Sequence, residues 1–324
     1  MRSIKVLSID GGGIRGIIPA IILADLQKRL GKNLYEVFDL IAGTSTGGII
    51  ALGIGTRANH GQPYSPDELL NLYVQNGAAI FQKHWYTGLR ELFRSKYSPR
   101  GLEETLERYF RDTEFKTALT PLLISSYDLH AQRPFFFKSH VIATHANWNW
   151  PVIAVARATS AAPTFLPPLH LARGHEDYAL VDGGVYVNNP AMAAFAEARR
   201  IYPEFQRFVV VAVGTGDRQD RIAYAQARRW GLLGWASQIV PVFMDSVSEA
   251  VDFELEHMPG CSYRRLQVLG LQVPNADMDN VTPANIEKLQ EIAREFVKSK
   301  SDELDKLCAE LKEGRGSDMP GTGR

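Results

Sequence analysis

The sequence predicts an α/β protein in three layers, with a mainly parallel central sheet covered by helices on both faces. Short apolar, β-branched runs of the kind found in buried strands are followed directly by apolar residues at helical spacing. The first such run, residues 4–9, leads through three glycines into a helix, and the second, residues 37–43, leads at once into a helix over residues 47–55. Strand–helix–strand–helix order with such short connections favours parallel pairing.

Local signals justify the individual elements. Pro19 lies in the first turn of the first helix, where proline is tolerated, and Gly31 ends that helix. Asn189 and Pro190 supply an N-cap and a first-turn proline for a helix over residues 190–201. Further strands are expected at residues 121–129, 133–139, 178–184 and 207–216, and further helices at residues 66–80, 101–111, 152–163 and 283–311.

One domain is the simplest organisation. No internal repeat or linker divides residues 1–312, whereas residues 313–324 have the composition of a disordered tail. Hydrophobic residues make up 45% of the chain and charged residues 22%, as in ordinary globular proteins.

Charge and cysteine content limit the classes of function. Lys+Arg and Asp+Glu number 36 each, so no overall field attracts nucleic acid, and no nucleic-acid partner is expected. The two cysteines are too few for a disulfide framework or a zinc site. Because the N-terminus reaches Asp10 before a signal-peptide core could form, we expect a cytoplasmic protein. No apolar stretch approaches the ~18 residues of a transmembrane helix, so any contact with a membrane is peripheral, at its inner face.

The segment GTSTG, residues 43–47, matches the G-x-S-x-G pattern at a predicted strand–helix turn. A sharp turn there exposes the Ser45 hydroxyl as a nucleophile, Gly43 and Gly47 let neighbouring backbone pass closely, and the helix N-terminus favours developing negative charge. The alternative is a Ser/Thr-rich turn that only caps a helix.

The segment DGGGIRG, residues 10–16, places three glycines at the end of the neighbouring strand. Backbone amides of Gly11, Gly12 and Gly13 at that point can stabilise the oxyanion of a reacting ester. A dinucleotide-binding loop fits less well, because no acidic residue ends the second strand, and a Walker A loop is excluded because no Gly-Lys-Ser/Thr follows. Arg15 is a candidate contact for an anionic head group or a partner for a carboxylate.

Two residues are candidates for the base that accepts the serine proton. Asp182 ends an apolar strand and precedes two glycines, as a residue exposed at a sheet edge would, or as a turn aspartate that caps its own backbone. A Ser–Asp–His triad would add His257, but His257 lies at a predicted helix end and no neighbouring motif marks it as catalytic.

The motifs DGGGIRG, GTSTG and DGG, in this order, resemble those of the patatin-like phospholipases. Residues 38–51, 156–168, 182–190, 213–216 and 277–293 also resemble patatin sequences, so the resemblance extends nearly from end to end. It implies a patatin-like α/β/α fold and a lipid acyl hydrolase that uses a Ser–Asp dyad and neither histidine nor metal nor cofactor. The positions it assigns are Ser45 as nucleophile, Asp182 as base, Gly11, Gly12 and Gly13 as oxyanion hole, and Gly43, Gly47 and Gly183 as supporting glycines.

The expected substrate is a phospholipid or another fatty-acyl ester. Some bacterial patatin-like proteins that this sequence resembles are anti-phage effectors switched on by cyclic nucleotides, which would imply a cyclic-nucleotide activator here. Two further alternatives are a catalytically quiet storage or binding protein on the same scaffold, and nucleotide binding at the glycine run without hydrolysis. The intact Ser45 and Asp182 argue against a quiet scaffold.

Several aromatic segments are candidates for reaching lipid. Residues 227–244 combine Arg228 and Arg229 with tryptophans and aliphatic residues, typical of an interfacial lid, although such a pattern more often packs on a core. Other candidates for lining an acyl groove are Trp85 with Tyr86 and Trp148 with Trp150.

Overall fold

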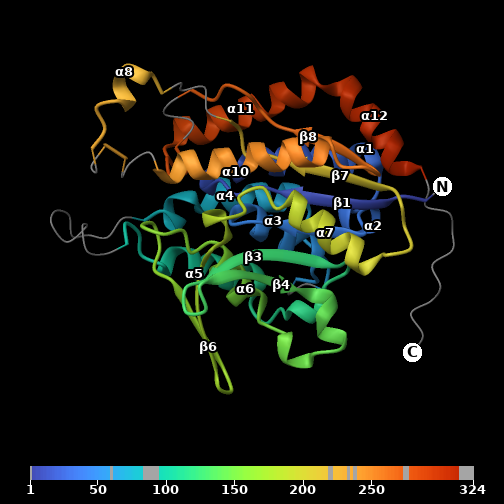
Figure 1. The fold of residues 1–324 in the computed structure, drawn as a ribbon, viewed down its shortest axis with the longest axis horizontal. Coiled ribbons are helices and arrows are strands. Elements are labelled where there is room, and N and C mark those ends of the chain that lie inside the picture. Colours follow the sequence, from blue (N-terminus) through green and yellow to red (C-terminus); the bar gives the residue numbers. More distant parts are fainter. Residues whose placement is uncertain are drawn as a thin grey trace.

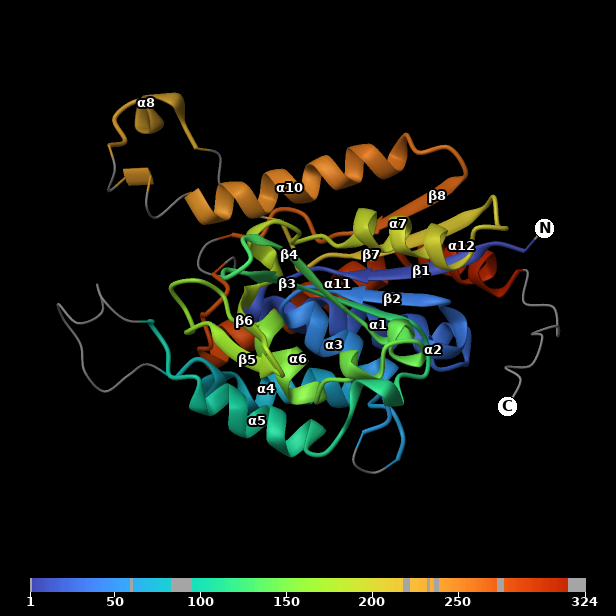
Figure 2. The same ribbon diagram turned by 60° about the horizontal axis from the view of Figure 1, so that its bottom comes forward.

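The structure is a computed structural model that describes residues 2–58, 61–82, 95–217, 222–231, 234–235, 239–272 and 277–313. The described residues form three layers, an eight-stranded sheet between two layers of helices, as Figures 1 and 2 show. This confirms the predicted fold class. None of the described helices is both long and apolar enough to cross a membrane.

The central sheet is mixed and mostly parallel. Its strands are β1 (Ile4–Ile9), β2 (Leu40–Gly43), β3 (Leu122–Asp128), β4 (Arg133–Lys138), β5 (Leu169–Arg173), β6 (Glu176–Asp182), β7 (Phe208–Val213) and β8 (Cys261–Leu266). Their order is β5-β6-β3-β2-β1-β7-β8, with β4 paired to β3. The pairs β1–β2, β2–β3, β1–β7 and β7–β8 are parallel, whereas β4, β5 and β6 enter antiparallel pairs.

One feature of the pairing brings two distant strand ends together. β4 runs antiparallel along one edge of β3 from Leu123 to Asp128, so β2 and β6 both lie on its other edge. There β2 ends with Gly43 opposite Ile124, and β6 ends with Asp182 opposite Ser126. The two strands therefore meet end to end, about 7 Å apart along β3.

The two faces of the sheet bury separate apolar clusters. Side chains along β7 alternate between them, because successive residues of a strand point to opposite faces. The smaller cluster is covered by α7 (Ala191–Ile201) and α10 (Ile239–Glu256). The larger is covered by α1 (Ile17–Leu30), α3 (Thr46–Gly55), α4 (Pro66–Ile80), α5 (Arg100–Phe110), α6 (Val152–Thr159), α11 (Pro283–Ser299) and α12 (Ser301–Lys312). Figure 2 shows α7 and α10 on one side of the strands and α1, α3 and α6 on the other.

Short helical turns complete the chain. They are α2 (Leu34–Val37), α8 (Tyr224–Ala227) and 3-10 turns at Gly13–Gly16, Phe115–Thr117, Ser139–Ala143, Ala146–Trp148 and Gly183–Val185.

Most predicted elements are confirmed, with three differences. The strand expected from residue 37 begins only at Leu40, because Asn33 and Glu36 form a capping box that makes Leu34–Val37 helical. The helix expected over residues 283–311 is broken at Lys300 into α11 and α12. Strands β5 and β8 were not predicted, since their mixed polar and apolar residues do not form an apolar run. Residues 314–324 lie outside the described residues.

Candidate active site

Ser45 lies on a sharp turn between β2 and α3. Its backbone adopts φ 54°, ψ −123°, a conformation that a residue with a side chain rarely takes and that is typical of a strained nucleophile turn. The Thr159 Oγ1 accepts a hydrogen bond from the Ser45 amide at 2.8 Å, and the Ser45 carbonyl accepts one from the Ile49 amide at 3.1 Å. The turn is therefore fixed from both sides, and Ser45 stands at the N-terminus of a helix, where negative charge is favoured.

The turn is possible only because Gly47 has no side chain. A Cβ at this position would collide with the backbone carbonyls of Ile9 and Asp10, at the end of the neighbouring strand β1. Gly43 must be glycine for a similar reason, because a Cβ at Gly43 would collide with the backbone carbonyl of Gly47. Both glycines let the turn lie directly against the end of β1, as the sequence predicts.

The three glycines after β1 have different hydrogen-bonding environments. The Gly11 amide donates to the Asn188 carbonyl at 3.1 Å, so it is not the unoccupied oxyanion donor that the sequence predicts. Gly12 and Gly13 line the pocket beside Ser45, and within the described part of the chain their amides meet no backbone or side-chain acceptor. Gly13 requires glycine, because its φ is 57° and a Cβ would collide with the Met278 carbonyl.

Asp182 reaches the same point from the opposite direction, at the end of the antiparallel strand β6. Its carboxylate is buried, accepts a hydrogen bond from the Gly184 amide at 2.8 Å and lines the same pocket as Ser45. Burial raises the pKa of Asp182 to about 7, although the Ser45 side chain and the Gly184 amide oppose that shift. Gly183 packs against Ser125 of β3, where a Cβ would collide, and this fixes the chain just after Asp182.

A pocket of about 330 Å³ opens onto these residues. Gly12, Gly13, Ser45 and Asp182 form its polar end, which we call the floor. Its remaining wall is mostly apolar and includes Ile49, Ile80, Phe81, Leu102, Phe165, Leu166, Val185, Phe243, Met244 and Met278. A pocket with one polar end and a long apolar wall can hold a hydrocarbon chain with its reactive group at Ser45.

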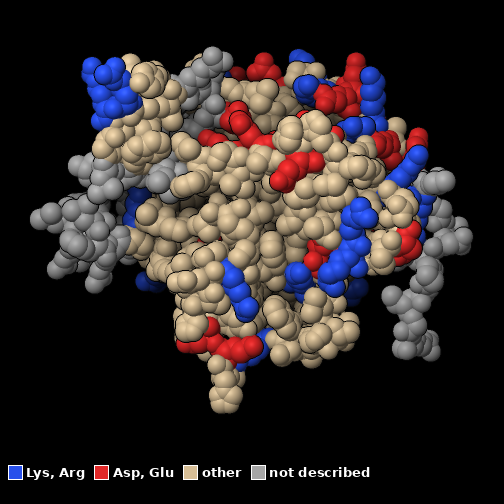
Figure 3. All heavy atoms as spheres, viewed as in Figure 1, with Lys and Arg blue, Asp and Glu red and all other residues tan. Residues whose placement is uncertain are grey.

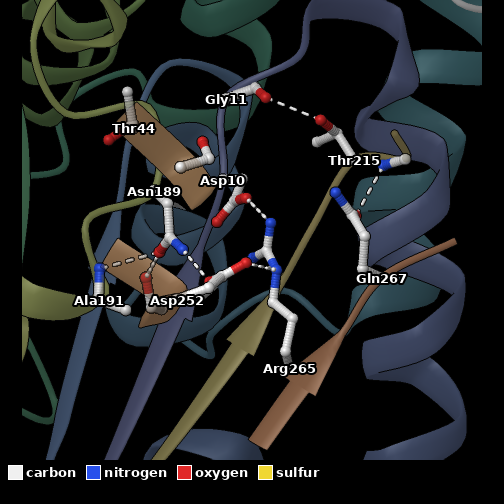
Figure 4. A network of polar contacts seen from close by, with 12 residues as sticks. Asp10, Gly11, Thr44, Asn189, Ala191, Thr215, Asp252, Arg265 and Gln267 are labelled. Atoms are coloured by element: carbon white, nitrogen blue, oxygen red, sulfur yellow. Dashed lines mark hydrogen bonds and ion pairs between the residues drawn. The ribbon is translucent and has the colours of Figure 1, made fainter. Parts of the chain in front are cut away.

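A buried polar network lies beneath the glycine loop (Figure 4). Asp10 is paired with Arg265 of β8 at 2.6 Å, and Arg265 in turn lies 3.4 Å from Asp252 of α10. Burial raises the pKa of Asp10, and the Arg265 guanidinium opposes that shift. Thr215 Oγ1 donates to the Gly11 carbonyl at 2.8 Å from the neighbouring strand end.

The structure bears differently on the two roles suggested for Arg15. It is buried, donates to the Gly216 carbonyl at 3.1 Å and is not part of the pocket wall. A head-group contact therefore has no support, whereas the charge of Arg15 acts on the Asp10 carboxylate and favours its ionised form.

The histidine alternative is not supported either. His257 is exposed at the end of α10, where its ring packs on Phe253 and its Nδ1 contacts the Phe253 carbonyl at 2.7 Å. Among the described residues, no histidine lines the pocket, and no group of three or more His, Cys, Asp or Glu side chains could hold a metal ion.

The aromatic candidates for the acyl groove differ from expectation. Trp148 stacks on Phe135, and Trp150 packs edge-on against Phe137 and Tyr178, so both belong to a separate aromatic cluster and not to the pocket. Trp85 and Tyr86 lie outside the described residues.

The beginning of α10 contributes to the wall of the pocket through Phe243 and Met244. Figure 2 shows α8 standing away from the sheet. In the described part of residues 227–244, the exposed side chains of Trp235, Val242 and Phe243 do not favour packing on the core. Phe243, 58% exposed, and Met244 line the pocket, whereas Trp235 is 43% exposed beyond it and packs on Trp230. We call Val185, Phe243 and Met244 the rim.

Three supporting residues were missed by sequence reasoning. Thr159, Asn188 and Met278 hold the Ser45 turn and the glycine loop through the contacts given above. Each lies in a segment that resembles patatin sequences, but none belongs to the short motifs that point to chemistry.

The fold and site together define a protein with a nucleophile turn and a carboxylate at an apolar pocket. The sequence model of the patatin-like phospholipase family matches residues 7–195. Patatin-like protein 2 of Arabidopsis thaliana is 31% identical to this chain, in an alignment that covers 91% of this chain and 83% of the relative. Patatin-like protein 1 of Oryza sativa subsp. indica is 30% identical, in an alignment that covers 99% of this chain and 86% of the relative. The chain therefore belongs to the patatin-like phospholipase family, which supports lipid acyl hydrolysis in general.

Among solved structures, VipD from Legionella pneumophila aligns with 91% of this chain and over 67% of the VipD chain, with 11% sequence identity and a TM-score of 0.35. This likeness is too weak to bear on the function.

Proposed function

We propose that this protein is a lipid acyl hydrolase of the phospholipase A or carboxylesterase type, acting through a Ser45 acyl-enzyme with Asp182 as base. The observation that carries the proposal is the placement of Ser45 and a buried Asp182 together at the floor of an apolar pocket. An ordinary aspartate, with a pKa near 4, is a weak base at neutral pH. Because burial raises the pKa of Asp182 to about 7, it accepts a proton well while remaining substantially ionised.

The reaction needs no group beyond these residues and water. Ser45 Oγ attacks the acyl carbonyl carbon as its proton passes to Asp182, which forms a tetrahedral oxyanion. The carbon–oxygen bond to the alcohol then breaks, and the leaving alcohol or lysolipid takes the proton from Asp182. Water attacks the acyl-enzyme, again with Asp182 as base, and releases the fatty acid and free Ser45.

The amides of Gly12 and Gly13 are the proposed oxyanion donors. Gly12 and Gly13 both line the pocket that contains Ser45, whereas the Gly11 amide is engaged by the Asn188 carbonyl. Each such donor contributes about 3 kcal/mol to the stability of the transition state. The N-terminus of α3 adds a favourable field at the same point.

A membrane surface is the proposed source of the substrate. Val185 and Phe243 line the pocket and are exposed, and Tyr224, Trp235 and Val242, which precede Phe243 in the chain, are exposed too. Arg228 and Arg229 are exposed beside them, and Figure 3 shows Lys and Arg atoms gathered where Figure 1 places α8. Aromatic and basic side chains on one surface fit the interface of an anionic bilayer.

Hydrolysis of p-nitrophenyl butyrate and of a diacyl phospholipid tests the catalytic proposal. Ser45→Ala and Asp182→Ala should each lose activity by about 10⁴-fold or more, whereas the matched control His257→Ala keeps it. For the wild type, kcat/KM should rise with pH through about 7, because Asp182 is a base only when ionised. Each assay is run with and without cyclic dinucleotides, so that an activator-dependent enzyme is not missed. A wild type that cleaves no ester under either condition contradicts the proposal.

Flotation with vesicles tests the membrane contact separately from hydrolysis. The Ser45→Ala protein should float with vesicles containing anionic phospholipid, and this binding should weaken several-fold when Trp235→Ser is added. Binding that does not depend on Trp235 would place the contact on another surface.

A further inference from the structure

A buried chain of charges connects the glycine loop to the helix that carries part of the rim. Asp10, directly before the glycines, receives Arg265 Nη2 at 2.6 Å, and Arg265 Nε lies 3.4 Å from Asp252 Oδ2. Figure 4 shows the Arg265 guanidinium between the two carboxylates. The side chains of Asp10 and Arg265 are 3% and 14% exposed, so solvent screens this pair little.

The same network of polar contacts extends from Asp252 to Asn189, which lies just before α7. Asp252 Oδ1 accepts Asn189 Nδ2 at 3.0 Å and the Tyr263 hydroxyl. Asn189 Oδ1 in turn accepts the Ala191 amide at 3.0 Å, at the beginning of α7. The residue before Asn189, Asn188, accepts a hydrogen bond from the Gly11 amide with its backbone carbonyl. The glycine loop is thus attached to the network at Asp10 and again at Asn188.

Helix α10 couples this network to the pocket. Asp252 lies nine residues beyond Phe243 on α10, about 13 Å along the helix axis. Because a helix of this kind moves as a rigid body, an ion pair at Asp252 fixes the position of Phe243 and Met244 as well. Strand β8, which carries Arg265, is the edge strand next to β7.

We propose that Arg265 is a positioning residue that holds the glycine loop and α10 in the arrangement that the reaction requires. Through Asp10 it fixes the direction of the Gly12 and Gly13 amides, and through Asp252 it fixes the rim. A guanidinium suits this role, since its rigid planar fork holds its charge and donors in fixed directions between the two carboxylates, whereas a lysine ammonium is a compact charge on a flexible stem. The inference rests on the proposed function for its kinetic consequence, but not for its structural one.

The preceding residue, Arg264, provides a matched control. It lies on the same strand, half exposed, and pairs with Glu310 at 3.1 Å on the surface. Arg265→Lys keeps the charge and loses the fork, so kcat for p-nitrophenyl butyrate should fall 10- to 100-fold while KM changes less than threefold. Arg264→Lys should leave both constants unchanged. A change in KM alone, or equal effects of the two variants, overturns the proposal.

A second measurement does not depend on activity. Amide hydrogen exchange should become faster at residues 10–16 and at residues 239–256 in Arg265→Lys, and at neither segment in Arg264→Lys. Should Arg265→Lys not fold, the double variant Asp10→Asn/Arg265→Met removes both buried charges and should fold, because an ion pair replaced as a whole is tolerated better than one that is broken. It should show the same faster exchange.

The two measurements separate the possible failures. Unchanged exchange in both segments overturns the positioning role, whatever the enzyme does. Faster exchange in Arg265→Lys, combined with a wild type that hydrolyses no ester, supports the positioning role and contradicts only the proposed function.

Discussion

The floor and the rim of the pocket are held by different physical means. Backbone contacts fix the floor: the Ser45 turn lies against the end of β1, and the Gly13 turn lies against the Met278 carbonyl. Side chains form the rim, where Phe243 is 58% exposed. A rigid floor keeps reacting atoms in place, whereas an open rim can admit substrates of different shape.

The floor also contains two energetically unfavourable features, a strained backbone conformation and a buried carboxyl group. Ser45 has a positive φ, and Asp182 is buried with its pKa raised to about 7. Both features are destabilising, and both belong to the residues with proposed chemical roles. Substitutions in the floor should therefore change stability strongly, some of them upward, while substitutions at the rim should change mainly the choice of substrate.

The largest expected effect is a pH-dependent stabilisation by Asp182→Asn. Asp182 has a raised pKa when folded, so its contribution to stability is complete below the unfolded value of 3.8 and is lost as the pH rises to about 7. An asparagine does not titrate. The free energy of unfolding of the variant, relative to wild type, should increase by at most about 4 kcal/mol between pH 4 and pH 8. Denaturant titrations at both pH values measure it.

Asp177→Asn, an exposed substitution on the same strand, serves as the control and should change by less than about 0.5 kcal/mol. A relative stability of Asp182→Asn that is the same at pH 4 and pH 8 would show that Asp182 titrates normally.

The next largest effect is expected from a methyl group in the floor. Gly47→Ala drives a Cβ into the backbone carbonyls of Ile9 and Asp10, which cannot move without shifting β1. We expect a loss of about 3 kcal/mol of stability, together with most activity. Gly231→Ala, outside the pocket, meets no atom within 4 Å and should change stability by less than about 0.5 kcal/mol. Thermal unfolding of the two variants compares them directly, and similar losses would contradict the tight backbone packing of the floor.

The same distinction explains what the sequence can predict. The floor was predictable because its constraints are local: glycines at fixed spacing around Ser45 are required by the turn itself. The meeting of Asp182 with Ser45 was predicted, but the antiparallel direction of β6 was not, because it depends on which edge of β3 remains open. The engagement of Gly11 by Asn188 and the pairing of Asp10 with Arg265 join residues far apart in the chain, and no periodicity encodes them.

An intermediate effect is expected at the support of the nucleophile turn. Thr159 is fully buried, and its hydroxyl accepts the Ser45 amide, so Thr159→Val keeps the shape and leaves that amide unpaired. The expected loss is about 2 kcal/mol, with a fall in kcat as the turn relaxes. Thr56→Val, at a buried threonine whose hydroxyl donates to the Leu52 carbonyl away from the pocket, should lower stability alone. A normal kcat in Thr159→Val would mean that β2 and α3 hold the turn without it.

The smallest effect on stability belongs to the rim, where Phe243→Ser should change the free energy of unfolding by less than about 0.5 kcal/mol. The substrate preference should change instead, because Phe243 covers part of the apolar wall that a long acyl chain contacts and a short one does not reach. Loss of about 1 kcal/mol of apolar contact corresponds to roughly a fivefold lower kcat/KM for the octanoate ester. The butyrate ester should be affected less, and comparing the two p-nitrophenyl esters removes any difference in active protein. Equal losses on both esters would mean that Phe243 acts on the floor, and that rim and floor are one mechanical unit.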